Sequence, residues 1–221
     1  SVKRTGEQVR VAFVAPQDRA GLQLDLAEKR LVELSELSAR SLTKEEKQEQ
    51  STKLTQEADE SIAIAQKELL RLTKETPEKA VQVATQIKER ATRSQEQAEK
   101  VASANVLLRL DETKSAALAV IVKEKEAAKV SDQEVTAHLE EAISELEERL
   151  ARLESVHAAG FQGDNVQEAQ KAQETLEDAR ASLVRNDFTI ALVGITRTRD
   201  IILAGERSVA TSGDAATDGL Q

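Results

Sequence analysis

Small and aliphatic side chains recur through the middle of the chain at alternating spacings of four and three residues. This spacing is a heptad seam, the pattern by which α-helices pack side by side along their length. Its members are Ala80, Ala84, Ile87, Ala91, Ser94, Ala98, Val101, Asn105 and Leu108. Because six of these nine residues are Ala, Ser or Asn, a partner helix can approach closely while little apolar area is buried per turn. The seam therefore predicts long, closely packed helices.

The pattern leaves two interpretations open for the length of the helix that carries this seam. One helix spans residues 77–129, or the helix breaks near Asp111, since Asp is a good N-cap and the apolar spacing falters just after it. Asn105 has two interpretations as well. A polar residue in a seam often fixes the register or the number of partner helices, and it can equally mark a break before Asp111.

Five further segments place their apolar residues on one face of a helix. Aromatic residues are 1% of the chain and it holds only two prolines, so the core must consist of aliphatic side chains on long helices. We expect an all-α fold, an elongated bundle of long amphipathic, coiled-coil-like antiparallel helices. The apolar positions are Ala20, Leu24, Ala27, Leu31 and Leu34; Leu54, Ala58, Ile62, Ala65, Leu69 and Leu72; Leu139, Ile143, Leu146, Leu150 and Leu153; Val166, Ala169, Leu176, Ala179 and Leu183; and Phe188, Ala191, Leu192, Ile195 and Ile202.

Helix starts are marked by capping residues. Thr43 with Glu46 and Ser131 with Glu134 match the capping box, in which each side chain satisfies a free backbone N–H of the first turn. Both prolines, Pro16 and Pro77, stand where a first helical position is expected. Helix boundaries are therefore predicted at caps rather than at flexible linkers.

Two stretches lack helical periodicity. Gly160 and Gly163 enclose Phe161 in a predicted turn, and Asp164 is the expected cap of the helix that follows. Residues 210–221 have no apolar period and are predicted to be disordered. We therefore expect a single elongated domain over residues 1–209, with a subdivision near residue 130 as the alternative, and a disordered tail over 210–221.

The composition argues against several functions. A net charge of −9 opposes adhesion to nucleic acid, and the three phenylalanines are too far apart in the sequence to form a platform for stacking bases. With no cysteine, the chain has neither a disulfide nor a thiolate nucleophile or ligand. No apolar run is long enough to cross a membrane. We therefore expect no nucleic-acid partner and no membrane insertion by these residues.

Site chemistry is sparse. Glu154 and His157 form the one ExxH step of the kind that di-iron bundles use in pairs, whereas His138 lies four residues after Glu134. A histidine near a helix end, interacting favourably with the helix dipole, is the simpler interpretation of His157. We assign no catalytic, cofactor-binding or metal-binding residue, expect no cofactor, and predict that the chain is not an enzyme.

Two runs of alternating charge are candidate docking surfaces for a partner. They cover residues 44–47 and 123–126, each with two lysines and two glutamates. The alternative interpretation is local, because opposite charges three and four residues apart stabilise an exposed helix by about 0.2 to 0.5 kcal/mol per pair. Both interpretations leave a protein partner or self-association through helix faces as the expected mode of interaction.

The N-terminal residues carry a resemblance to a known family. A Lys3–Arg4 pair precedes a short amphipathic segment, and after Pro16 the sequence LQLDLAEKRLVEL occupies residues 22–34. Over residues 2–40 the chain resembles an uncharacterised bacterial domain of unknown function, found in helical proteins with a signal peptide or a membrane anchor. The resemblance implies a trimmed leader or anchor and a location outside the cytoplasmic membrane. It implies no activity and transfers no functional residue.

These observations lead to one expected function and two alternatives. The first is a structural or protein-interaction module, extracytoplasmic and without catalytic activity. The second is an extracytoplasmic helical protein that binds a small ligand or a metal, and the third is an intracellular regulator that sequesters a partner. Ser1 follows either a removed initiator Met or a cleaved leader, which are the two origins that the absence of methionine allows.

Overall fold

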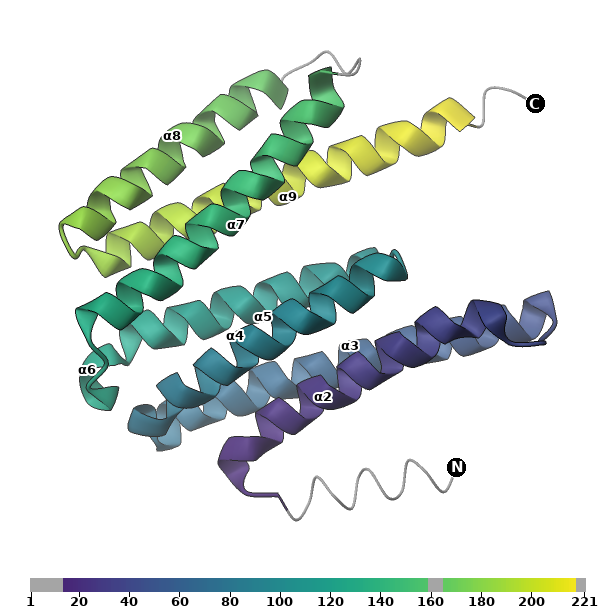
Figure 1. Ribbon diagram of the computed structural model, residues 1–221, viewed down its shortest axis with the longest axis horizontal. Helices are drawn as coiled ribbons and strands as arrows, with labels where there is room; N and C mark the ends of the chain where they lie inside the picture. The colour runs from purple at the N-terminus through teal and green to yellow at the C-terminus, as the bar shows by residue number, and fades with distance from the viewer. Residues whose placement is uncertain (1–13, 159–164, 218–221) are drawn as a thin grey trace. The chain divides into compact units, whose positions relative to one another are not determined.

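The computed structural model describes residues 14–158 and 165–217 (Figure 1). Over these residues the chain forms helices that pack on one another and contains no strand, which confirms the all-α prediction. The chain divides into two compact units, residues 1–129 and 130–221. The division falls near residue 130, where the sequence allowed a subdivision of the predicted 1–209 domain.

The first unit consists of two antiparallel helical hairpins. Helix α2 pairs with α3 and helix α4 pairs with α5, while α2 also lies beside α4 and α3 beside α5. The hairpins therefore lie side by side, with first helix against first helix and second against second. The elements are α2 (Pro16–Ser35), the 3-10 helix η1 (Glu36–Ala39), α3 (Lys44–Glu75), α4 (Pro77–Lys100), α5 (Ala104–Lys123) and the short α6 (Lys125–Ala128).

The seam on α4 is buried inside this unit. Its small residues let α2 and α5 pack closely against α4, as the spacing predicted. The seam therefore closes within one chain and is not exposed for pairing with another. The seam residues without solvent exposure are Ala80, Ala84, Ile87, Ala91, Ser94 and Ala98.

The predicted start signals of α2, α3 and α4 are confirmed. Pro16 and Pro77 begin α2 and α4, where their missing N–H has no helical partner to lose. At the start of α3 the capping box is complete. The Glu46 N–H donates to Thr43 Oγ1 at 3.2 Å and the Thr43 N–H donates to Glu46 Oε2 at 2.9 Å.

Both interpretations of the helix that carries the seam are wrong, because the chain turns at residues 101–103, between α4 and α5, and not at Asp111. Ala102 adopts φ 51°, its N–H donates to Glu99 O at 3.1 Å, and the Ser103 N–H donates to Ala98 O at 3.2 Å. These two hydrogen bonds form a Schellman motif, which ends a helix at a left-handed residue. Glycine normally occupies that position, so the alanine gave no sign of a turn.

The turn also corrects the interpretations of Asp111 and Asn105. Asp111 is buried in the interior of α5 and caps no helix. Asn105 is exposed in the first turn of α5, so it cannot fix register inside the core. The seam pattern continues across the turn only in the sequence, since Val101 and Leu108 are half-buried at the ends of different helices.

Replacing Ala102 by Gly should raise the free energy of unfolding by about 1 kcal/mol, because glycine removes the steric cost of the left-handed conformation. Urea unfolding followed by circular dichroism measures the change. Ala63→Gly, inside α3, is the matched control and should lower the free energy of unfolding by about 1 kcal/mol. Equal destabilisation by both substitutions would contradict the left-handed turn.

The second unit is a three-helix arrangement in which each helix contacts the other two. Its helices are α7 (Asp132–Ala158), α8 (Asn165–Val184) and α9 (Phe188–Thr217). At the start of α7 the Glu134 N–H donates to Ser131 Oγ at 3.2 Å, the first half of the predicted capping box. The core consists of Val135, Leu139, Ile143, Leu146, Leu150, Ala172, Leu176, Ala179, Leu183, Phe188, Ala191, Ile195 and Ile202.

The turn between α8 and α9 repeats the geometry of the turn between α4 and α5. Asn186 has φ 59°, its N–H donates to Leu183 O at 2.9 Å, and the Asp187 N–H donates to Ser182 O at 2.9 Å. Asn tolerates the left-handed conformation better than other residues that carry a Cβ atom. This turn could therefore be seen in the sequence, whereas the one at Ala102 could not.

The helical backbone of α9 continues to Thr217, past residue 210, where the sequence pattern predicts the disordered tail to begin. Helical hydrogen bonds are local and need no apolar period, and Ala, the best helix former, is frequent in this stretch. The predicted turn at Gly160, Phe161 and Gly163, with its cap Asp164, lies outside the described residues.

Two glycines of α9 should respond differently to replacement by Ala. A Cβ atom at Gly194 would lie 3.0 Å from Ala179 Cβ and 3.4 Å from Thr175 O, both on α8, whereas at Gly205 the nearest atom is Leu153 Cδ1 at 3.4 Å. Gly205→Ala should stabilise the protein by about 1 kcal/mol through helix propensity. Gly194→Ala should be less stable than Gly205→Ala by about 1 to 2 kcal/mol, because α8 must move away. Equal melting profiles would show that α8 and α9 are not in close contact.

Candidate functional site

Charged side chains connect the two hairpins of the first unit. Arg90 Nη1 on α4 lies 3.0 Å from Asp25 Oδ2 on α2. Arg109 on α5 donates to Asp59 on α3 through Nε at 3.0 Å and Nη2 at 3.5 Å. The hydrogen bond to the Asp59 carboxylate raises the pKa of Arg109 above its ordinary value. Each pair joins a helix of the second hairpin to a helix of the first.

Two charged side chains are buried in the first unit, and the ExxH step lies on α7. Lys88 and Asp111 are buried in the first unit, and each interacts with another group. Glu154 is exposed, and the side chain of its ExxH partner His157 lies outside the described residues. Over the residues described, no group of three or more His, Asp or Glu side chains is arranged to hold a metal ion.

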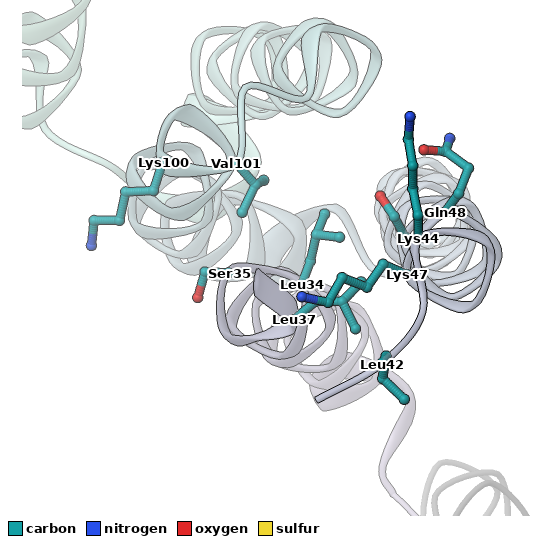
Figure 2. Close-up of a pocket in the computed structure, with 10 residues that line it drawn as sticks. Leu34, Ser35, Leu37, Leu42, Lys44, Lys47, Gln48, Lys100 and Val101 are labelled. Atoms are coloured by element: carbon teal, nitrogen blue, oxygen red, sulfur yellow. The ribbon is translucent and has the colours of Figure 1, made fainter. Parts of the chain in front are cut away.

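The first unit has a hollow at the end where α2 stops, α3 begins and α4 stops (Figure 2). Its volume is about 600 Å³, within the roughly 300 to 1,000 Å³ of typical ligand sites. It is a shallow hollow, more open to solvent than enclosed. The lining residues are Leu34, Ser35, Leu37, Leu42, Lys44, Lys47, Gln48, Ser51, Lys100 and Val101.

The hollow combines an apolar floor with a basic rim. In Figure 2, Leu34 and Leu37 lie at the base and Lys47 extends across toward them, while Lys44 and Lys100 stand at the sides with their ammonium groups turned outward. The Lys100 ammonium donates to Gln97 Oε1 at 3.3 Å. The lining includes three lysines and no carboxylate. This is an unusual local charge for a chain with a net charge of −9.

The two charge runs that the sequence singled out have different surroundings in the structure. In the run 123–126 each lysine pairs with its neighbour, Lys123 with Glu124 at 3.5 Å and Lys125 with Glu126 at 3.2 Å. In the run 44–47 both lysines line the hollow, while Glu46 completes the capping box. Sequence reasoning found this run but not the leucines beneath it.

Three large aliphatic side chains are exposed on either side of the turn between α8 and α9, and we call these three residues the patch. Val184, Ile190 and Val193 are 86%, 58% and 62% exposed. Ile190 and Val193 are three residues apart on α9, so they lie on the same helix face. This patch is the second candidate surface, and it belongs to the second unit.

Across the described residues, no helix is both long and apolar enough to cross a membrane. Comparisons with protein-family models, with curated protein sequences and with solved structures find no match for this chain. The resemblance over residues 2–40 therefore stays a prediction, and function must be argued from the two surfaces described above.

Proposed function

We propose that the chain is a structural or protein-interaction module that binds a protein partner or a second copy through the outer faces of its helices and catalyses no reaction. The observation that carries the proposal is the exposure of Ile190 and Val193 on one face of α9 and of Val184 at the end of α8, the residues of the patch. Exposed aliphatic side chains that share one face commonly mark interaction surfaces.

The burial of the α4 seam supports the same proposal, because it removes the seam as a surface for association. Because the α4 seam is fully enclosed in the first unit, association through it would require that unit to open. An interaction that preserves the fold must use outer faces. On the described part of the second unit, the exposed large aliphatic side chains are those three residues.

The double variant Ile190→Asn/Val193→Asn tests this surface. A photo-crosslinking residue at position 184 should give discrete adducts, with a second copy in the purified protein or with a partner in the source cell, and the double variant should abolish them. The matched control is Ile64→Asn/Leu70→Asn, which removes exposed aliphatic residues from α3 of the other unit. Adducts that survive in the first variant, or disappear equally in both, would reject the patch.

We also propose an extracytoplasmic location in a bacterium, supported by the resemblance over residues 2–40. A reporter enzyme that is active only outside the cytoplasm, fused to the natural gene after residue 221, tests this. Activity supports the proposal, and its absence favours the intracellular regulator instead. The small-ligand alternative is favoured by a separate observation, the hollow of the first unit.

A further inference from the structure

We infer that two copies of this chain associate through α9, with the two α9 helices side by side and antiparallel. The inference rests on the proposed function and names a second copy as the partner of the patch. The surface is the outer stripe of α9, whose residues follow one another at spacings of three and four, as in helices that pair along their length. Its members, all exposed, are Ile190, Val193, Arg197, Asp200, Ala204 and Arg207.

The positions on either side of the outer stripe carry no charge. They are Thr189, Gly194, Thr196, Ile201 and Leu203, of which all but Thr189 are half-buried. In a pair of helices these flanking positions meet the partner at the edges of the contact, where charged residues usually decide which helices pair. Here the charges that select a partner are therefore those within the stripe itself.

The two charged residues at the centre of the stripe are complementary to those of a second copy. In an antiparallel pair centred between them, each Arg197 lies opposite Asp200 of the second copy, so two ion pairs form across the symmetry axis. In a parallel pair Arg197 would face Arg197 and Asp200 would face Asp200, and like charges disfavour that contact. The order of the charges therefore selects the antiparallel arrangement.

Both charged groups are available for this contact. Arg197 is exposed and forms no hydrogen bond or ion pair with the residues that the structure describes. Arg199 donates to Asp200 at 3.2 Å and 2.7 Å, but both hydrogen bonds reach the same carboxylate oxygen, Oδ1. The Asp200 side chain is 60% exposed, so its other oxygen, Oδ2, can accept from a second copy.

The ends of the stripe are complementary as well. The same register places Val193 opposite Ala204, and it places Ile190 opposite the hydrocarbon stem of Arg207. The small Ala204 side chain lets the two helices approach closely. Ile190 and Val193, which are 58% and 62% exposed in one copy, are thereby covered in the pair, and covering them is favourable.

The contact is small. From Ile190 to Arg207 it is about 26 Å long at 1.5 Å per residue. Helix α9 continues past Arg207 to Thr217, so the helix of the second copy also extends toward Val184 at the end of α8. One pair of helices buries less area than a permanent dimer does, so we expect reversible association that depends on concentration.

Sedimentation equilibrium of the purified chain tests the pairing. We expect a monomer–dimer equilibrium with a dissociation constant on the order of 10 to 100 μM. Arg197→Asp should weaken it about tenfold, because two attractive contacts become repulsive. The charge swap Arg197→Asp/Asp200→Arg should restore it to within about threefold of the parent chain. The matched control Arg152→Asp makes the same charge change at an exposed arginine of α7 and should alter the constant less than about twofold.

Engineered cysteines report the register directly, because the chain contains no cysteine of its own. On oxidation, a mixture of Val193→Cys and Ala204→Cys chains should form a disulfide-linked dimer, since these positions face each other in the antiparallel pair. Neither variant alone should do so, because the two copies of one position are about 16 Å apart along the helices.

A chain that stays monomeric at about 1 mM, a charge swap that fails to restore pairing, or disulfides within each single-cysteine variant alone would each overturn the inference. The proposed function fails separately. A monomeric chain that still gives adducts at position 184 with another protein in the source cell would retain the patch as an interaction surface and exclude a second copy as its partner. Absence of both the dimer and the adducts would reject both.

Discussion

Replacing Ile87 by Ala should lower the free energy of unfolding by about 2 to 4 kcal/mol. Ile87 has no solvent exposure and is the one bulky side chain among the buried seam residues of α4. The neighbouring seam positions, Ala84 and Ala91, are too small to fill the cavity that the substitution leaves.

Ile64→Ala is the matched control for this prediction. The same side chain is 44% exposed on α3, so its loss should cost less than about 1 kcal/mol, partly offset by the better helix propensity of Ala. Urea unfolding followed by circular dichroism gives the difference, and hydrogen exchange read by peptide should assign the loss to residues 14–129. Similar effects of the two substitutions would show that the seam is not packed as described.

Removing the acidic partner of a buried arginine should have the second-largest effect. Arg149 on α7 has a side chain that is 7% exposed and donates to Glu206 on α9 through Nε at 3.1 Å and Nη2 at 2.8 Å. Glu206→Ala leaves the buried guanidinium without this bidentate partner. We expect a loss of about 2 kcal/mol, below the usual range because Arg149 has a further interaction and Glu206 is 38% exposed.

Arg149→Met should change the free energy of unfolding by less than about 1 kcal/mol, because an apolar side chain fills the site and the freed Glu206 carboxylate can reach water. The quantity to compare is the free energy of unfolding of Arg149→Met against that of Glu206→Ala. Chemical denaturation of both, with Glu147→Ala as a control that removes the exposed pair with Arg180, distinguishes a buried pair from a surface pair. Equal losses for Arg149→Met and Glu206→Ala would refute the assigned burial.

The helices could be predicted from sequence because their signals are local. Apolar spacing identified the buried faces, and Thr43 and Pro77 marked helix starts through hydrogen bonding that involves only neighbouring residues. The turn at Ala102 was missed for the same reason. Alanine has no preference for the left-handed conformation found there, whereas Asn186, at the equivalent turn, tolerates that conformation.

The candidate surfaces could be predicted only in part. The lysines of residues 44–47 were noticed as a charge run, but the hollow requires Leu34, Leu42 and Val101 to meet from different segments, which no spacing in the sequence encodes. The patch at Val184, Ile190 and Val193 is likewise invisible in the sequence. An aliphatic residue on a helix is expected to face the core, and its exposure is decided by where the neighbouring helices end.

Two of the ion pairs that join the hairpins have a mechanical consequence. Arg90 with Asp25 and Arg109 with Asp59 each join the second hairpin to the first, one pair on each helix of a hairpin. A force that slides one hairpin along the other loads both pairs together, so both must rupture in one event. A force that peels the hairpins apart from one edge loads them in succession. The first unit should therefore resist sliding of one hairpin along the other more strongly than separation of the hairpins from one edge.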